Sequence, residues 1–250
     1  MIRILLCGCN GKMGRTITAC AAKRDDLKIV AGLDINPEQS ADFPVFTKPE
    51  DCNVPIDVII DFSHPSSLSG VLRYACTNHI PAVIATTGLS DEQLADIRNA
   101  AQQAPLFSSA NMSLGVNLLT ELAKKAAEIL GDSFDIEIIE KHHNQKIDAP
   151  SGTALLLAES VKDGLSYTPR YVYDRQSVRE KRDPHDIGIS SIRGGTIVGE
   201  HDVIFAGHDE YITLSHTALS KDIFAVGALN AAVFLAKQPN GYYTMKNMLA

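Results

Sequence analysis

The fold is decided near the start of the chain, where residues 2–14 read IRILLCGCNGKMG. An apolar strand pattern leads into Gly8, Gly11 and Gly14, and residues 15–23 are helical in composition. A strand, a glycine turn and a helix open the dinucleotide-binding fold, because glycines let the backbone approach a pyrophosphate at the helix N-terminus. The spacing is G-x-x-G-x-x-G and not the usual G-x-G-x-x-G, so the motif needs support from the segments around it.

That support comes from a second strand pattern over Leu27–Leu33, which ends at Asp34. An acidic side chain about twenty residues past the glycines can accept a hydrogen bond from a ribose hydroxyl. The alternative is an ordinary loop carboxylate. We predict that this part of the chain binds a dinucleotide through Gly8, Cys9, Asn10, Gly11, Lys12, Met13 and Asp34.

The rest of the first half alternates strands and helices. Residues 36–56 contain four prolines and are interpreted as irregular with one short strand. Strands are predicted over residues 58–61 and 82–85, and helices over residues 65–78 and 91–103. This pattern is typical of a parallel sheet covered on both faces, in which the carboxyl ends of the strands carry the ligand. Residues 62–64, 86–88 and 109–112 are therefore expected to line a cofactor cleft.

The pattern changes near Ser113. Residues 115–130 predict an amphipathic helix with Leu118, Leu122, Ala126 and Ile129 on one face. Strands are predicted over residues 135–140, 187–193, 197–205 and 211–218, and the last three are interpreted as hairpins of an open mixed sheet. The polar residues 163–186 are interpreted as a long loop over the site, and residues 223–237 as a closing helix.

The chemistry is concentrated in residues 140–154, EKHHNQKIDAPSGTA. His142 and His143 are imidazoles, a side-chain type suited to proton transfer near neutral pH, and Lys146 adds a flexible positive charge. Residues 151–153 precede an apolar helical run, where backbone N–H groups are unpaired and favour anions. The segment can thus hold carboxylates and supply a proton, although each part by itself is also compatible with a helix cap, a surface lysine or an ordinary histidine.

Composition narrows the class of protein. The chain has 250 residues, 45% of them hydrophobic and 21% charged, and no apolar run reaches the length of a membrane span. A net charge of −7 disfavours a nucleic-acid surface. The five cysteines form no CxxC pair and the N-terminus resembles no signal peptide, so we expect a cytoplasmic protein with neither membrane nor nucleic-acid partners.

From Gly8 onward, and most specifically in residues 140–154, the chain resembles the 4-hydroxy-tetrahydrodipicolinate reductase (dihydrodipicolinate reductase) family of lysine biosynthesis. The resemblance implies an α/β fold with a Rossmann-like domain of residues 1–112, completed by 223–250, and an α+β domain of residues 113–222. The latter would bind substrate and form a homotetramer.

For the site, the resemblance implies a cyclic imine carrying two carboxylates as the substrate. His142 and Lys146 would be catalytic, and substrate would bind to His143, Ser151, Gly152 and Thr153. Further cofactor contacts would come from Ala85, Thr86, Thr87, Ser109, Ala110, Asn111 and Met112.

Two cofactors are compatible with the residues. Asp34 would repel the 2′-phosphate of NADPH, whereas Lys12 and Arg15 could attract it. We expect use of both NADH and NADPH with a modest NADH preference, on the order of tenfold.

Three alternatives remain at this point. His142, His143 and Asp148 could bind a metal in a hydrolase, although neighbouring strand residues point to opposite faces. A nucleotide-binding redox sensor could use Cys9 as its thiol. A reductase could also act on another small amino-dicarboxylate.

Overall fold

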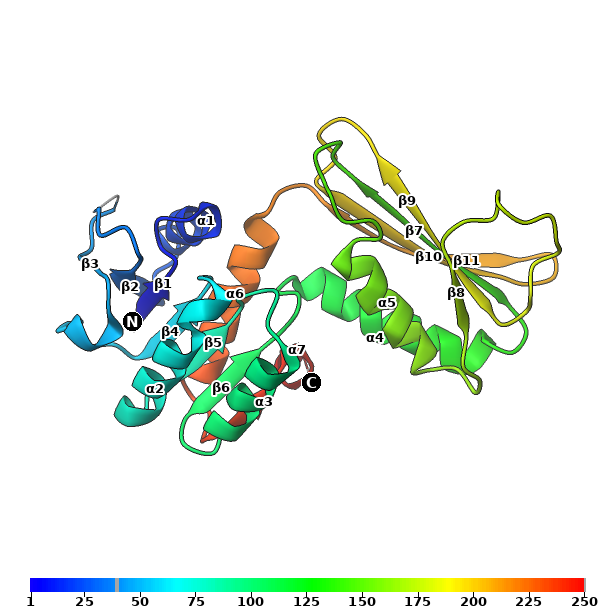
Figure 1. The fold of residues 1–250 in the computed structure, drawn as a ribbon. Coiled ribbons are helices and arrows are strands. Elements are labelled where there is room, and N and C mark those ends of the chain that lie inside the picture. The colour runs from blue at the N-terminus through cyan, green and yellow to red at the C-terminus, as the bar shows by residue number, and fades with distance from the viewer. Residues whose placement is uncertain (39–40, 250) are drawn as a thin grey trace. The chain divides into compact units, whose positions relative to one another are not determined.

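The computed structural model describes residues 1–38 and 41–249, which divide into two compact units (Figure 1). Met1–Leu114 together with Lys221–Ala250 form the first unit, and Gly115–Ser220 form the second. The expected divisions, after residues 112 and 222, lie within two residues of these positions. Residues 39 and 40, part of the stretch expected to be irregular, fall outside the described residues, as does residue 250.

The first unit is built on a seven-stranded sheet in the order β12-β6-β5-β4-β1-β2-β3, and every neighbouring pair is parallel. Its strands are β1 (Ile2–Cys7), β2 (Leu27–Leu33), β3 (Val45–Phe46), β4 (Val58–Asp61), β5 (Ala82–Ile84), β6 (Pro105–Ser108) and β12 (Gly241–Tyr243). The predicted parallel sheet is confirmed. The short strand β12 was not expected, because three residues are too few to give a strand pattern.

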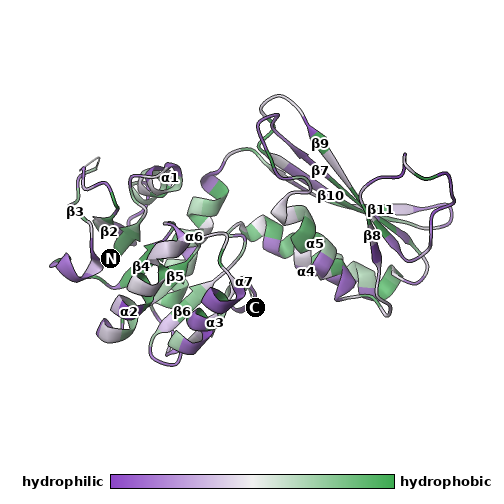
Figure 2. Cartoon of the chain, in the orientation of Figure 1, coloured by the Kyte–Doolittle hydropathy of each residue, from purple (hydrophilic) through white to green (hydrophobic). Residues whose placement is uncertain are grey.

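Helices cover both faces of this sheet because its central strands are apolar on both sides, as Figure 2 shows by their green colour. Ile4 and Leu6 of β1 pack in one cluster with residues of α1 and α6, and Leu5 packs in another with residues of α2 and α3. The helical segments are α1 (Lys12–Ala21), α2 (Leu68–Asn78), α3 (Asp91–Ala100), α6 (Asp222–Leu235), α7 (Met245–Leu249) and the 3₁₀ turns η1 (Pro49–Asp51) and η2 (Pro65–Ser67).

Helix α1 begins three residues earlier than predicted, and α6 packs closely on the sheet. Gly14 lies inside α1, where a Cβ atom would be 2.2 Å from the Gly8 carbonyl oxygen. A Cβ atom at Gly227 of α6 would be 1.7 Å from the Met112 carbonyl oxygen. Glycine is therefore required at both positions for the backbone segments to approach.

The second unit holds a five-stranded mixed sheet in the order β11-β10-β7-β9-β8. Its strands are β7 (Asp135–His142), β8 (Arg170–Val172), β9 (Asp186–Arg193), β10 (Gly199–Ala206) and β11 (Tyr211–Ala218). Helices α4 (Leu114–Leu130) and α5 (Gly152–Lys162) supply the apolar side chains that pack against Ile136 and Ile138 of β7. The predicted open mixed sheet is confirmed, since Ile139 and Ile204 on the other face are only half-buried.

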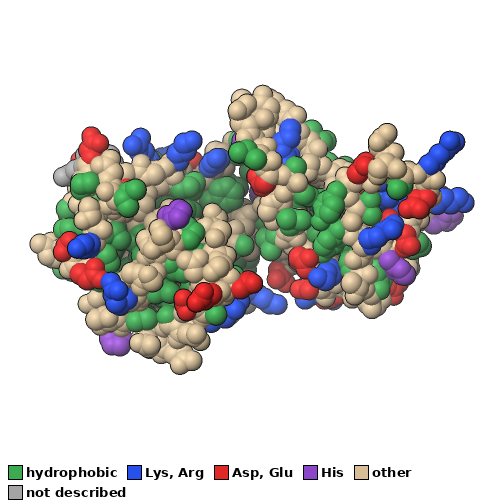
Figure 3. All heavy atoms as spheres, viewed as in Figure 1, with side chains coloured by type: hydrophobic (Ala, Val, Ile, Leu, Met, Phe, Trp, Pro, Cys, Tyr) green, Lys and Arg blue, Asp and Glu red, His purple; other side chains and the backbone are tan. Residues whose placement is uncertain are grey.

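The surface carries charges of both signs. On the face drawn in Figure 3, lysine and arginine side chains are interspersed with aspartate and glutamate side chains. None of the helices in the described ranges is long and apolar enough to cross a membrane.

One predicted hairpin is wrong. β10 and β11 pair antiparallel as expected, but β9 and β10 are separated by β7, which pairs parallel with β9 and antiparallel with β10. Side chains explain the central place of β7: Glu140 binds Arg193 of β9 on one face, and Lys141 binds Glu200 of β10 on the other. These polar partners are distant in sequence, so the glycines between β9 and β10 gave no sign of the intervening strand.

The apolar face predicted for α4 is largely exposed. Leu118, Leu122 and Ile129 are 54%, 47% and 69% exposed, whereas the buried face includes Ala123 and Ala127. The small alanines allow close packing: a Cβ atom at Gly164, just after α5, would lie 3.0 Å from the Cβ atom of Ala127. Val116 and Leu119 are also buried on this face, so the packed face of α4 combines large and small apolar side chains.

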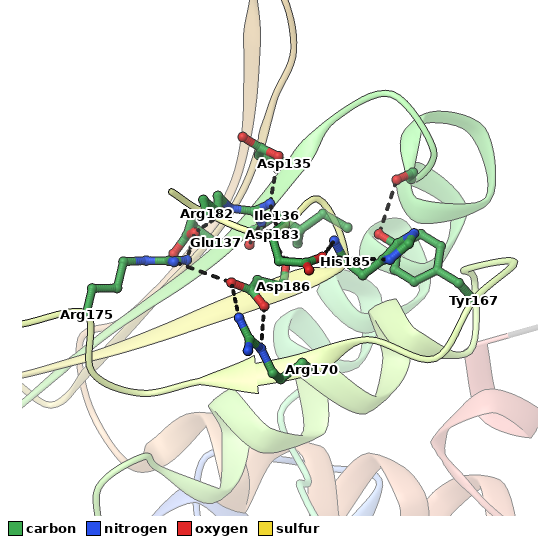
Figure 4. A network of polar contacts seen from close by, with 11 residues as sticks. Asp135, Ile136, Glu137, Tyr167, Arg170, Arg175, Arg182, Asp183, His185 and Asp186 are labelled. Carbon is green, nitrogen blue, oxygen red and sulfur yellow. Dashed lines mark hydrogen bonds and ion pairs between the residues drawn. The ribbon is translucent and has the colours of Figure 1, made fainter. Parts of the chain in front are cut away.

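The segment expected to lie over the site is anchored elsewhere (Figure 4). Residues 163–186 contain β8, and Arg182 binds Asp135 and Glu137 at 2.7 and 3.2 Å. Arg175 also binds Glu137, at 2.6 Å. Asp135 begins β7, so this segment is held at the opposite end of that strand from His142.

Candidate functional site

The glycine loop of the first unit leads from β1 into the N-terminus of α1. Gly8 has a φ of 76°, which favours glycine, and its N–H donates to the Leu33 carbonyl oxygen at 2.7 Å. Gly11 is the N-cap of α1, and among the described residues no side chain caps it. A substituent on Gly8 would meet the Phe62 carbonyl oxygen at 2.6 Å. This bare helix N-terminus, cleared of side chains, fits a pyrophosphate.

Asp34 lies directly beside the loop. Its two carboxylate oxygens accept the backbone N–H groups of Asn10 at 3.0 Å and Asn36 at 3.1 Å. The Asn10 side chain donates to the Asn36 carbonyl oxygen at 2.8 Å, so the glycine loop and the end of β2 are joined. Ile35, which follows, is 98% exposed. The carboxylate therefore lies where a hydrogen-bond acceptor for the ribose of a dinucleotide would be required.

A buried carboxylate organises the ends of β4 and β5. Asp61 is inaccessible to solvent; it accepts from the Ser63 hydroxyl and, at 2.9 Å, from the Thr86 hydroxyl. Burial raises the pKa of Asp61, while these hydrogen bonds act in the opposite direction. Asp61 thus fixes two of the loops expected to line the cofactor cleft, a role that its position as the last residue of an apolar strand did not reveal.

Several predicted cofactor residues can contribute only through their backbone. Cys9, Ala85 and Met112 are 3%, 4% and 3% exposed and belong to the apolar core. The Thr86 hydroxyl already donates a hydrogen bond to Asp61. Met112 packs in one cluster with residues of α6, so a cofactor contact of this residue would be made by its backbone. Lys12, Thr87 and Ala110 are exposed, and Ser109 binds the Asn111 carbonyl oxygen at 2.7 Å. A dinucleotide site made largely of backbone fits these residues.

The second unit gathers the signature around Glu140, whose side chain is fully buried. His142 lies two residues further along β7, on the same face, and its Nδ1 is 2.6 Å from Glu140 Oε2. The Ser151 N–H donates to Oε1 at 3.1 Å. Arg193 of β9 donates to both oxygens, at 2.8 and 2.7 Å. One carboxylate thus connects two strands and the start of α5.

These contacts set the charge states. Burial raises the pKa of Glu140, but hydrogen bonds from Arg193, His142 and Ser191 outweigh this effect and bring the pKa to about 2. Burial also lowers the pKa of His142, against the hydrogen bond to Glu140. Glu140 is therefore an anion at neutral pH and accepts the Nδ1 proton of His142, so that Nε2 is the nitrogen able to exchange a proton.

Ser151 has a structural role. It is 2% exposed, and its hydroxyl accepts the Ala154 N–H at 3.1 Å and lies 3.0 Å from Nε2 of His201. The hydroxyl of Ser151, a predicted substrate-binding residue, therefore caps the N-terminus of α5. His201 lies edge-to-face with His142, with ring centroids 5.2 Å apart, and burial lowers the pKa of His201 to about 4.

The remaining signature residues lie next to this cluster along the chain. The Lys146 ammonium contacts both oxygens of Asp148, at 2.8 and 2.9 Å, and the Lys146 N–H donates to the His143 carbonyl oxygen. Gly152 is exposed in the first turn of α5, and a Cβ atom there would meet nothing within 4 Å. A cation and an open helix N-terminus therefore flank His142, an arrangement suited to a carboxylate-bearing ligand.

Two alternatives lose support from these positions. Cys9 is buried, and burial raises its pKa to about 11, so a reactive thiolate is disfavoured at neutral pH. In the described part of the chain, no group of three or more His, Cys, Asp or Glu residues is arranged to hold a metal ion. The Nδ1 atom of His142 is instead hydrogen-bonded to Glu140.

Sequence reasoning missed Arg193 and His201. Arg193 ends β9 and His201 lies in β10, about fifty and sixty residues from His142. Neither belongs to a short motif. The only available signal was their place in strands predicted to form one sheet, and that sheet was expected to have a different strand order.

Models of a known protein family match both units of the chain. A family model described as dihydrodipicolinate reductase, N-terminus, matches residues 2–112, and one described as dihydrodipicolinate reductase, C-terminus, matches residues 115–249. The chain belongs to the dihydrodipicolinate reductase family. It is an oxidoreductase of the reduction step in diaminopimelate and lysine biosynthesis.

Individual relatives extend over the whole chain. Proteins named 4-hydroxy-tetrahydrodipicolinate reductase from Clostridium tetani (strain Massachusetts / E88) and Clostridium botulinum (strain Eklund 17B / Type B) are each 50% identical to it. The alignments cover 100% of this chain and 97% and 98% of the relatives.

Solved structures share its fold. The dipicolinate-bound dihydrodipicolinate reductase from Paenisporosarcina sp. TG-14 has a TM-score of 0.82 at 26% identity, covering 98% of this chain and 97% of that one. A DAP dehydrogenase from C. glutamicum has a TM-score of 0.58 at 13% identity, covering 100% and 95%. The second likeness concerns the fold alone.

Proposed function

We propose that this chain reduces 4-hydroxy-tetrahydrodipicolinate to tetrahydrodipicolinate with NADH or NADPH. The substrate takes up one hydride and one proton and loses its 4-hydroxyl group as water, so the products are tetrahydrodipicolinate, the oxidised cofactor and water. The observation that carries the proposal is the pairing of Glu140 with His142 beside Lys146 and the open N-terminus of α5, in a chain that also carries the glycine loop and Asp34. The substrate is a six-membered cyclic imine with two carboxylates. Bringing such a dianion out of water requires cations and N–H donors.

Each residue has a distinct task in this proposal. The bound nicotinamide supplies hydride. His142, with Nδ1 held by Glu140, and Lys146 supply the proton that the ring takes up together with the hydride. His143 and the backbone N–H groups of Gly152 and Thr153 bind the carboxylates, while Ser151 keeps the helix N-terminus in place through its cap.

For the cofactor, we propose use of both NADH and NADPH with a modest NADH preference. Asp34 is supported as a ribose ligand by its position beside Asn10, and the neutral Ile35 after it offers no charge to a 2′-phosphate. Lys12 and Arg15 are exposed on the first turns of α1 and partly offset the repulsion. The preference expected from these opposed charges is about tenfold, or ~1.4 kcal/mol.

The domain roles follow the two units. Residues 1–112 with 223–250 bind the dinucleotide, and residues 113–222 bind substrate and form the oligomer. A homotetramer built through the open face of the five-stranded sheet is supported by Ile139 and Ile204, which leave apolar surface there. We place the enzyme in the cytoplasm, where lysine biosynthesis supplies its substrate.

The decisive experiment is oxidation of reduced cofactor by the pure protein, with substrate made in situ from pyruvate and aspartate semialdehyde. Cofactor oxidation that depends on both precursors is expected. Turnover of another small amino-dicarboxylate imine, with none of this substrate, would favour the alternative reductase; dinucleotide binding without any turnover would favour a sensor.

Pyridine-2,6-dicarboxylate (dipicolinate), a planar compound with two carboxylates, tests the proposed anion site. It is bound in the reductase from Paenisporosarcina sp. TG-14, so we expect it to compete with substrate here. Lys146→Ala should relieve the inhibition by about tenfold or more, because it removes one charge-assisted contact. Equal inhibition of variant and parent would place the carboxylate site elsewhere.

A further inference from the structure

Arg193 ends β9 directly beside His142. The two strands are parallel and in register, with Arg193 opposite His142. The guanidinium points to Glu140, two residues back along β7, and donates to its two carboxylate oxygens at 2.8 and 2.7 Å. Such a two-pronged pair fixes the carboxylate in both position and plane, which a single ammonium cannot do.

Each carboxylate oxygen of Glu140 has two hydrogen-bond partners. Oε2 is bound by His142 and by one nitrogen of Arg193, and Oε1 by the other nitrogen and by the Ser151 N–H. With Arg193 as a fixed counter-charge, Glu140 stays ionised and remains an acceptor for His142 Nδ1. The imidazole is thereby held in one tautomer and one orientation.

The same guanidinium also holds the loop that carries Lys146. One of its nitrogens donates to the Asp148 carbonyl oxygen at 2.7 Å, and the Asp148 carboxylate binds the Lys146 ammonium. Arg193 therefore contacts both Glu140, which binds His142, and the backbone of Asp148, whose side chain binds Lys146. Its side chain is only 20% exposed, so these contacts are shielded from water.

We propose that Arg193 is a positioning residue: through Glu140 it fixes the tautomer and orientation of His142, and through the Asp148 carbonyl it holds the Lys146 loop. This inference rests on the proposed roles of His142 and Lys146 in reduction of the imine.

The test compares Arg193→Lys, Arg193→Met and Glu140→Asp with the parent enzyme in the coupled reductase assay. Arg193→Lys keeps the charge but loses the two-pronged geometry, and kcat should fall about tenfold to a hundredfold while dinucleotide affinity is unchanged. Arg193→Met removes a cation near His142 and leaves the Glu140 charge unbalanced. The limb of the kcat–pH profile that belongs to His142 should then move to higher pH.

Arg175→Lys is the matched control. Arg175 also bridges two acids, Glu137 and Asp186, in the same unit, but at the other end of β7. It should lower thermal stability without altering the pH profile. If Arg193→Met does not fold, Arg193→Lys and Glu140→Asp carry the test, since both retain charge and can be compared at matched folded fraction.

The outcomes separate cleanly. Loss of kcat per folded enzyme in Arg193→Lys supports the positioning role, and a pH profile displaced to higher pH in Arg193→Met supports it independently. Unchanged kcat per folded enzyme in Arg193→Lys, or an unmoved pH profile in a folded Arg193→Met, assigns Arg193 to stability alone. If the parent itself does not reduce the substrate, the proposed function fails, and the positioning role fails with it.

Discussion

His142 is a buried imidazole whose two nitrogens face different surroundings. Nδ1 is 2.6 Å from Glu140, while Nε2 lies toward Gly199, where a Cβ atom would be 3.1 Å away. Glycine at that position keeps space beside the nitrogen that can exchange a proton. The residue-scale predictions concern this imidazole and its neighbours.

Replacing His142 or Lys146 with alanine should lower turnover by about 10² or more, because each change removes a candidate proton donor. Dinucleotide affinity should persist, since both residues lie in the second unit and the glycine loop in the first. Steady-state kinetics and fluorescence titration with reduced cofactor measure the two effects.

His143→Ala serves as the contrast to those variants. As a proposed carboxylate ligand, His143 should affect KM for the substrate more than kcat. A pure defect in kcat would remove that assignment, and weak dinucleotide binding by His142→Ala would reverse the roles of the two units.

His201 predicts a pH dependence of stability. Its pKa is lowered by burial to about 4, whereas an unfolded histidine titrates near ~6.5. The unfolded state therefore binds the proton first, and the contribution of His201 is lost as pH falls from about 6.5 through about 4. His201→Gln should reduce the decline in unfolding free energy between pH 7 and pH 4.5 by roughly 2 kcal/mol.

Urea unfolding at several pH values checks this expectation. The control is His208→Gln, which removes an imidazole with a 98% exposed side chain. Parallel stability–pH curves for parent and His201→Gln would show that His201 is not the group responsible.

At the scale of elements, our proposal assigns the two binding surfaces to the N-termini of α1 and α5. α1 begins at a bare glycine, and α5 begins at a serine that caps it internally. The difference has a physical reason. A pyrophosphate binds to backbone N–H groups and needs a helix start without a side-chain cap, as in α1. In α5 the cap is buried, and the exposed Gly152 is the residue that a ligand could approach. Helix α4 shows the limit of pattern reasoning, because Leu118, Leu122 and Ile129 are exposed although they share an apolar face.

The end of β2 decides cofactor preference in our proposal. Asp34→Ala removes the charge that disfavours a 2′-phosphate, so use of NADPH should improve, by about tenfold in kcat/KM at low salt. In the parent, the NADH preference should shrink as salt screens Asp34. Kinetics with both cofactors at two ionic strengths measures this. An NADPH preference in the parent, or no gain in the variant, would show that Asp34 does not face the adenosine ribose.

At the scale of the whole molecule, the open face of the five-stranded sheet is the proposed assembly surface. Ile139→Lys places a charge on the central strand of that face, where burial of an unpaired ammonium is unfavourable, and should weaken assembly by at least ~10²-fold. Ile129→Lys makes the same change on the exposed side of α4 and is the control. Light scattering after size-exclusion chromatography measures the mass; a tetramer lost only in Ile129→Lys would move the interface to α4.

The sequence by itself determined the features that depend on local pattern. Strands β1, β2 and β4, the glycine loop and the mixed second sheet follow from apolar runs and glycine spacing, and residues 140–154 carry a motif long enough to identify a family. His142 and Lys146 could be selected from that motif because their chemistry is read from residue type and spacing.

Only the tertiary structure decided what depends on partners distant in the chain. The place of β7 between β9 and β10 brings Arg193 to Glu140 and His201 to Ser151, whose buried hydroxyl caps α5. Residues 163–186 likewise lie at the far end of β7 because their arginine side chains form ion pairs with Asp135 and Glu137. Strand order and ion pairing are set by the sum of many contacts across the sheet, and no local window of sequence contains that sum.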